Sequence, residues 1–145
     1  MQRLITLVLM AFLAARAPAA APQEVVLVVR ADSPVASMDS LTVRKLFLGL
    51  PVLVDGRLLH PVRNRSDPRL DEIFFQDIVA MSQSSYERQI LTGVNRQGWL
   101  RPAEYRSEAE VLGTLATDPN AVSFVWQRDL GHNPGMRIIR VLWSE

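Results

Sequence analysis

The sequence predicts an α/β fold, a small domain with a mixed sheet, and three observations lead to that class. Two apolar runs, residues 25–29 and 122–126, are rich in β-branched and aromatic side chains and are typical of strands. Between them, apolar residues recur at helical spacing. Turn signals at Asp55-Gly56 and Asp118-Pro119-Asn120 separate the segments. Strands that alternate with helical segments favour one α/β domain.

The first predicted strand covers residues 25–29, and its unbroken apolar character indicates burial on both faces. We expect Ser40 to cap a short helix after it, and Gly49 to end that helix. The apolar residues spaced to face inward from this helix are Val43, Leu46, Phe47 and Leu50.

Asp55-Gly56 predicts a hairpin or tight turn, followed by a strand over residues 57–63 in which Pro61 limits pairing. Asp67-Pro68 then opens the most clearly signalled helix, because Asp is a favoured cap and Pro suits the first turn. The apolar stripe expected on this helix contains Leu70, Ile73, Phe74, Ile78 and Met81.

Two capping boxes predict the remaining helices. The first spans residues 84–87 and opens a helix that stops near Gly93. Residues 95–105 have no clear period and are expected to form a loop. The second box, residues 107–110, begins a helix with Val111, Leu112 and Leu115 facing inward. Strands over residues 122–126 and 136–143 complete the chain.

The composition narrows the possible functions. A chain of 145 residues fits one domain rather than a large multidomain enzyme. The absence of cysteine excludes disulfides, thiolate metal sites and a cysteine nucleophile. A net charge of +1 gives no electrostatic reason to expect a nucleic-acid partner. The two histidines, His60 and His132, lack the spacing of a metal site or a catalytic triad, so we expect no enzyme, metal or cofactor.

The N-terminus has the pattern of a secretory signal. Arg3 precedes an apolar run over residues 4–15, and Ala17-Pro18-Ala19 provides small residues for cleavage. We therefore predict a signal peptide over residues 1–19 and a mature periplasmic domain over residues 20–145, with no stable membrane insertion after cleavage. An uncleaved anchor is the alternative, which the short run disfavours because a span needs ~20 residues.

An ordered series of motifs over residues 25–125 resembles the phosphate-binding periplasmic receptors of ABC importers, in particular their small members with a PBP-like domain. The series consists of Val26-Leu27-Val28-Val29, Leu46-Phe47-Leu48-Gly49, Asp55-Gly56, Pro61-Val62 followed by Arg63 and Arg65, Phe74-Phe75, and residues 118–125. The resemblance implies a fold like one lobe of a type II periplasmic binding protein. It also implies capture of phosphate or another small oxyanion for an inner-membrane transporter.

The resemblance also implies a ligand site at the start of the helix that Asp67 opens. Arg65-Ser66-Asp67 matches the beginning of the family's Arg-Ser-Asp-x-Ser-Gly-Thr phosphate segment, whereas Arg69-Leu70-Asp71 replaces Ser-Gly-Thr. Arginine forks beside exposed helix N–H groups favour an anion. The expected anion-binding residues are Arg63, Arg65, Ser66, Asp67 and Arg69. The competing interpretation pairs these arginines with Asp67, Asp71 and Glu72.

Two classes of function follow. The first is an exported solute-binding protein that captures an oxyanion. The second is a receptor-derived module that binds no ligand and contacts an inner-membrane transporter or a sensor protein. The loss of Ser-Gly-Thr favours the second class, and a periplasmic enzyme is a distant third.

Overall fold

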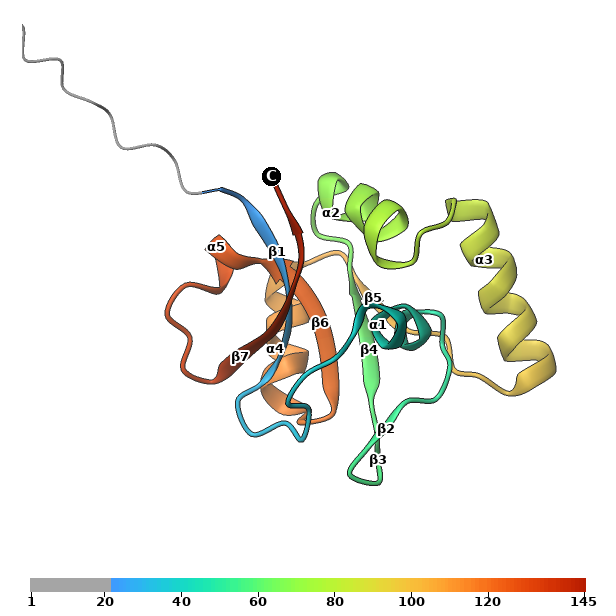
Figure 1. The fold of residues 1–145 in the computed structure, drawn as a ribbon, viewed down its shortest axis with the longest axis horizontal. Helices are drawn as coiled ribbons and strands as arrows, with labels where there is room; N and C mark the ends of the chain where they lie inside the picture. Colours follow the sequence, from blue (N-terminus) through green and yellow to red (C-terminus); the bar gives the residue numbers. More distant parts are fainter. Residues whose placement is uncertain (1–21) are drawn as a thin grey trace, which may run out of the picture.

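The computed structural model describes residues 22–145, so the predicted signal segment lies outside the described residues. Figure 1 shows a twisted sheet with helices packed against it. The strands are β1 (Glu24–Arg30), β2 (Leu53–Val54), β3 (Arg57–Leu58), β4 (His60–Asn64), β5 (Ala103–Tyr105), β6 (Ala121–Trp126) and β7 (Met136–Ser144). The α-helices are α1 (Ser40–Phe47), α2 (Pro68–Ile73), α3 (Gln83–Thr92), α4 (Glu108–Thr117) and α5 (Gln127–Leu130).

The main sheet is mixed, as the sequence predicts. Its five strands lie in the order β5-β4-β6-β1-β7. The strand β4 runs parallel to both β5 and β6, whereas β1 is antiparallel to β6 and β7. The carboxyl ends of β4, β5 and β6 therefore share one edge of the sheet, and a helix follows each of them (Figure 1).

Burial of β1 on both faces is confirmed. Val25, Leu27 and Val29 pack into the larger core, which α1, α2 and α3 cover. Val26 and Val28 pack on the opposite face, into a smaller core with residues of α4. The continuous apolar run of this strand thus reflects its place between two layers of helices.

Aromatic rings fill the centre of the larger core. Phe74 stacks on Phe124 with ring centroids 5.6 Å apart, and it meets Phe47 and Tyr86 edge to face at 5.8 Å and 5.2 Å. Phe74 is fully buried, as the predicted stripe requires. Of the other stripe residues, Leu70, Ile73 and Ile78 are also buried. Met81 lies beyond the end of the helix and is only partly buried, because Ala80 adopts a left-handed φ of 52° and turns the chain.

Two predicted helix starts are wrong by one or two residues. Asp39, rather than Ser40, caps α1, because its carboxylate accepts a hydrogen bond from the Thr42 N–H. Ser82, rather than Ser84, caps α3 in the same way through the Ser85 N–H. The predicted caps at Asp67 and at Ser107 are confirmed.

The segment expected to be a loop over residues 95–105 is more ordered than predicted. A π-helical turn, η2 (Gly93–Gln97), continues α3, and β5 pairs with β4. A second π turn, η1 (Phe74–Ile78), continues α2. The segment expected to be one strand over residues 57–63 divides at Leu59, which is buried and donates its N–H to the Val52 carbonyl.

The hairpin at Asp55-Gly56 is confirmed, with φ of 51° and 74° at its two central residues. Gly49 ends α1 with a φ of 89°. Within residues 22–145, none of the helices combines the length and the apolar character that a membrane crossing requires.

Candidate functional site

The candidate site lies at the carboxyl end of β4. Arg63 and Asn64 are the last residues of that strand, Arg65 and Ser66 follow it, and Asp67 caps α2. In open α/β sheets, ligands bind in the crevice outside the carboxyl ends of parallel strands. The predicted anion-binding residues therefore lie where a ligand of this fold class would be expected.

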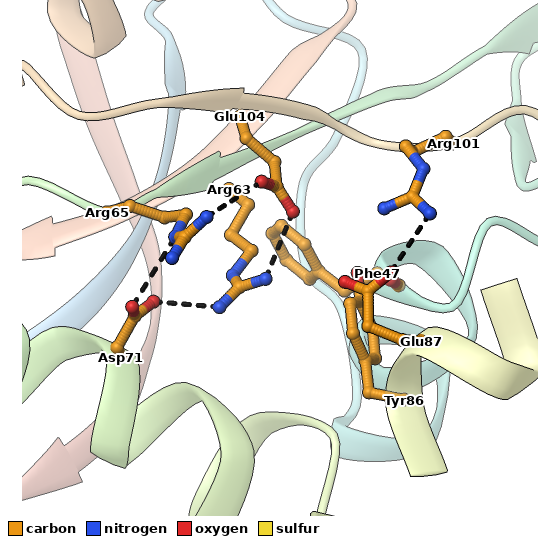
Figure 2. Close-up of polar contacts among 8 residues, drawn as sticks. All are labelled: Phe47, Arg63, Arg65, Asp71, Tyr86, Glu87, Arg101 and Glu104. Carbon is orange, nitrogen blue, oxygen red and sulfur yellow. Dashed lines mark hydrogen bonds and ion pairs between the residues drawn. The ribbon is translucent and has the colours of Figure 1, made fainter. Parts of the chain in front are cut away.

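Arg63 is buried instead of being exposed to a ligand. Its side chain is 2% exposed, and its two terminal nitrogens donate to Asp71 Oδ1 at 2.8 Å and to Glu104 Oε1 at 3.0 Å (Figure 2). The guanidinium carbon lies 4.5 Å from the centroid of the Phe74 ring and 4.7 Å from that of Phe75. Arg63 is therefore held by two carboxylates and two rings, in contacts that are typical of a structural arginine.

Arg65 contacts the same two carboxylates from the outer side. Its Nε donates to Asp71 Oδ2 at 3.4 Å, and its Nη1 donates to Glu104 Oε2 at 3.2 Å (Figure 2). We call Arg63, Arg65, Asp71 and Glu104 the ion cluster. Partial burial disfavours the charged form of Arg65, but Asp71 and Glu104 outweigh that effect and raise the pKa of Arg65. With two arginines and two carboxylates, the ion cluster carries no net formal charge.

Two guanidinium nitrogens of the ion cluster have no partner within the described residues: Arg63 Nε, which is buried, and Arg65 Nη2. Arg65 Nη2 has no hydrogen-bond partner among residues 22–145, and the Arg65 side chain is 25% exposed. The Arg65 N–H donates to the Tyr105 carbonyl at 2.8 Å, so Arg106 leaves the neighbouring strand beside it. Within the same described range, Arg106 forms no ion pair.

The other predicted residues have local partners. The Ser66 hydroxyl donates to Asn64 Oδ1 at 2.7 Å. Asp67 accepts from the Arg69 N–H at 2.8 Å and from Trp126 Nε1 at 3.0 Å. Arg69 pairs with Glu72 at 2.7 Å, and its guanidinium carbon lies 5.2 Å from the Trp143 ring centroid. Arg69 therefore has contacts separate from those of the ion cluster.

The sequence-based pairing was right for part of this arrangement. Asp71 pairs with both Arg63 and Arg65, and Glu72 pairs with Arg69, whereas Asp67 caps a helix and forms no ion pair within the described chain. Glu104 was missed because its strand was expected to be a loop. Its place follows from the parallel register, in which Arg63 lies opposite Glu104. The alternation of apolar and polar residues does not by itself reveal a strand as short as β5.

Comparisons with known proteins identify the fold. No family model matches the chain, and no curated protein sequence matches it. An ABC transporter substrate-binding protein with bound phosphate from Clostridium perfringens superposes with a TM-score of 0.60 at 10% identity, over 83% of this chain and 45% of that one. PstS from Borrelia burgdorferi gives 0.59 at 9% identity, over 82% and 47%.

An ABC-type phosphate transport receptor from Vibrio cholerae gives a TM-score of 0.52 at 13% identity, over 83% of this chain and 46% of the receptor. The chain thus spans just under half the length of these solved structures. At such low identity the likeness concerns the fold, which is that of one lobe of a periplasmic binding protein. The fold expected from the sequence motifs is confirmed at this level.

Proposed function

We propose that this chain is a solute-binding-type protein of the periplasm that captures phosphate or a related oxyanion for an inner-membrane ABC transporter. The observation that supports this function best is Arg65 Nη2, a free and partly exposed donor at the carboxyl end of β4. It lies on a fold that is also found in phosphate receptors. The anion would contact Arg65 and Ser66.

The described residues offer groups that would contact the anion from one side. The Ser66 hydroxyl can still accept a hydrogen bond while it donates to Asn64, so it suits a protonated oxygen of the ligand. Arg106, which follows β5, adds a cation that forms no ion pair within residues 22–145. Because the chain is about half as long as the receptors it resembles, we propose that another polypeptide segment forms the facing wall.

A second function is favoured by the ion cluster itself. Asp71 and Glu104 accept from four of the six guanidinium nitrogens of Arg63 and Arg65, and their negative charges oppose a dianion. A lobe with this arrangement can be stable without any anion. In that case the chain is a ligand-free interaction or sensor module in the periplasm, and its partner is a membrane protein.

Calorimetric titration with phosphate and with sulfate separates the two functions. For an oxyanion receptor, a 100-fold excess of ligand over Kd should also stabilise the fold by ~2.7 kcal/mol. Arg65→Ala should weaken anion binding by ~1.5–3 kcal/mol. Arg30→Ala is a matched control, because Arg30 is similarly exposed at 28% and pairs with Asp32 at another site.

For the interaction module, titration should give neither heat nor thermal protection at millimolar anion. Arg65→Ala should then change the free energy of unfolding by ~1 kcal/mol or less and have no affinity to remove. Equal loss of anion affinity in Arg65→Ala and Arg30→Ala would indicate nonspecific charge attraction and would contradict the proposed site.

A further inference from the structure

A pocket of about 440 Å³ lies beside β4 and β5, and none of the four residues of the ion cluster lines it. It is bordered by His60, the first residue of β4, whereas Arg65 follows the last residue of that strand. Val62 and Ala103, which also line the pocket, directly precede Arg63 and Glu104, and successive side chains of a strand point to opposite faces of the sheet. The pocket is therefore separate from the proposed oxyanion site and has a size within the range of small-molecule sites.

The walls of the pocket are mostly apolar. They come from residues 49–51 after α1, from β3, β4 and β5, from the segment before β5, and from the last turn of α4 and the residue that follows it. Val62 and Pro102 are buried within the lining, and Leu58 and Leu100 lie at its exposed part. Leu100 is 70% exposed, so an occupant of the pocket would cover an apolar side chain that water otherwise contacts.

Two close contacts at glycines pack the segment of Trp99 and Leu100 against its neighbours. A Cβ on Gly49 would lie 2.8 Å from the Leu100 carbonyl oxygen, and the ring of Trp99 fills the space where a Cβ of Gly93 would be. The Trp99 N–H also donates to the Gly93 carbonyl at 3.1 Å. The segment that carries Leu100 is thus fixed against α1 and η2 without any ligand, so that binding does not require the wall to form first.

On the polar side of the pocket, a hydrogen bond to Asp118 orients the ring of His60. His60 Nδ1 lies 2.7 Å from Asp118 Oδ2, and both residues line the pocket. Burial disfavours the ionised form of Asp118, but the His60 contact and the Asn120 N–H outweigh it and lower the pKa of Asp118. An ionised carboxylate can only accept, so Nδ1 carries the proton in this contact, and in that tautomer Nε2 is the ring's hydrogen-bond acceptor.

We infer that this pocket binds a small molecule with an apolar ring or short hydrocarbon body and a single hydroxyl group, which donates to His60 Nε2. The apolar walls suit the body of the ligand, and the acceptor at His60 suits the hydroxyl. A carboxylate at His60 would face the negative charge of Asp118, whereas Arg101, the cation in the lining, is already paired with Glu87 at 3.0 Å. A molecule without a donor would not form the hydrogen bond to His60, whose side chain is 50% exposed.

The test uses naphthol, its methyl ether and naphthoate as probes, with binding followed by amide chemical shifts of the labelled protein. Naphthol should shift the amides of residues 49–51, 58–62 and 98–103. The ether and naphthoate should bind about three- to tenfold more weakly, as expected for the loss of one hydrogen bond. His60→Phe keeps an aromatic ring but removes the acceptor, so naphthol and its ether should then bind equally.

Two leucines provide the matched control. Leu100→Asp puts a charge at the pocket and should weaken naphthol binding at least about tenfold. Leu53→Asp changes a leucine that is similarly exposed, at 62%, but does not line the pocket, and it should leave binding unchanged. The inference would be overturned if both variants weakened naphthol binding equally, or if the amide shifts were spread over other surfaces. It would also be overturned if His60→Phe still bound naphthol more tightly than its methyl ether.

Discussion

Arg63 is buried against Asp71, with Nη2 donating to Oδ1 at 2.8 Å and only 2% of the arginine side chain exposed. Asp71 lies on α2 and Arg63 on β4, so this contact joins the helix to the sheet. It also explains why a residue expected to bind an external anion is inaccessible. The guanidinium already has two carboxylate partners and lies against aromatic rings.

The first prediction concerns stability. Arg63→Ala should lower the free energy of unfolding by ~3–5 kcal/mol, because it leaves a cavity against Phe74 and Phe75 and removes one of the two arginines that pair with Asp71 and Glu104. Arg65→Ala should cost ~1 kcal/mol or less, because its side chain is 25% exposed and its ion pairs are partly solvated. Urea denaturation followed by circular dichroism measures both. Similar costs for the two variants would contradict a structural role specific to Arg63.

The second prediction concerns the aromatic core. Phe74→Ala should lower the free energy of unfolding by ~3–5 kcal/mol, because it leaves a cavity between Phe47, Phe124 and Tyr86. Leu41→Ala is the control, since Leu41 is 59% exposed and should change stability by about 0.5 kcal/mol or less. A denaturation midpoint of Phe74→Ala close to that of the control would be incompatible with the packing described here.

The elements that the sequence predicts well are those with a continuous buried surface. β1 and β6 are buried along nearly their whole length, and Val111 and Leu115 of α4 face one core, so their apolar patterns are unambiguous. β5 has three residues and lies at the sheet edge, so no pattern distinguishes it from a loop. The π turns after α2 and α3 likewise leave no recognisable signal in the apolar spacing.

The candidate site could likewise be predicted only in part, because some of its contacts leave no pattern in the sequence. The density of arginines and the helix start at Asp67 were visible in the sequence, and Asp71 could be named as a partner because it lies within eight residues of Arg63. Glu104 is 41 residues from Arg63, and only the parallel register brings the two together. A pairing that depends on strand register over such a separation needs the fold before it can be found.

The third prediction concerns processing. Export should remove residues 1–19 by cleavage after Ala19, since cleavage after Ala21 would leave Pro22 beside the scissile bond, where its ring hinders the peptidase. Intact-mass measurement of the protein recovered from a periplasmic extract determines the mature N-terminus. Recovery of a species that retains Met1 would contradict both the signal-peptide prediction and the proposed periplasmic location.

The last prediction concerns Tyr86, whose hydroxyl donates to the Phe47 carbonyl at 2.8 Å and whose side chain is buried. Burial raises the pKa of Tyr86 above its ordinary value of 10.0, although Arg63 nearby opposes the shift. At neutral pH, Tyr86→Phe should cost ~1 kcal/mol for the lost hydrogen bond. Above about pH 10 the unfolded chain loses the tyrosine proton and the folded chain keeps it, so the wild type should lose stability as pH rises.

Because Tyr86→Phe lacks that ionisation, its deficit should shrink by up to about 1.4 kcal/mol per pH unit and should disappear within about one unit above pH 10. Ser123→Ala is the control, since the buried Ser123 hydroxyl donates to the Val62 carbonyl at 2.6 Å but does not titrate in this range. Its deficit should stay constant in urea denaturation across the same pH series. A constant deficit for Tyr86→Phe as well would mean that the folded protein ionises Tyr86 as readily as the unfolded chain, against the burial described here.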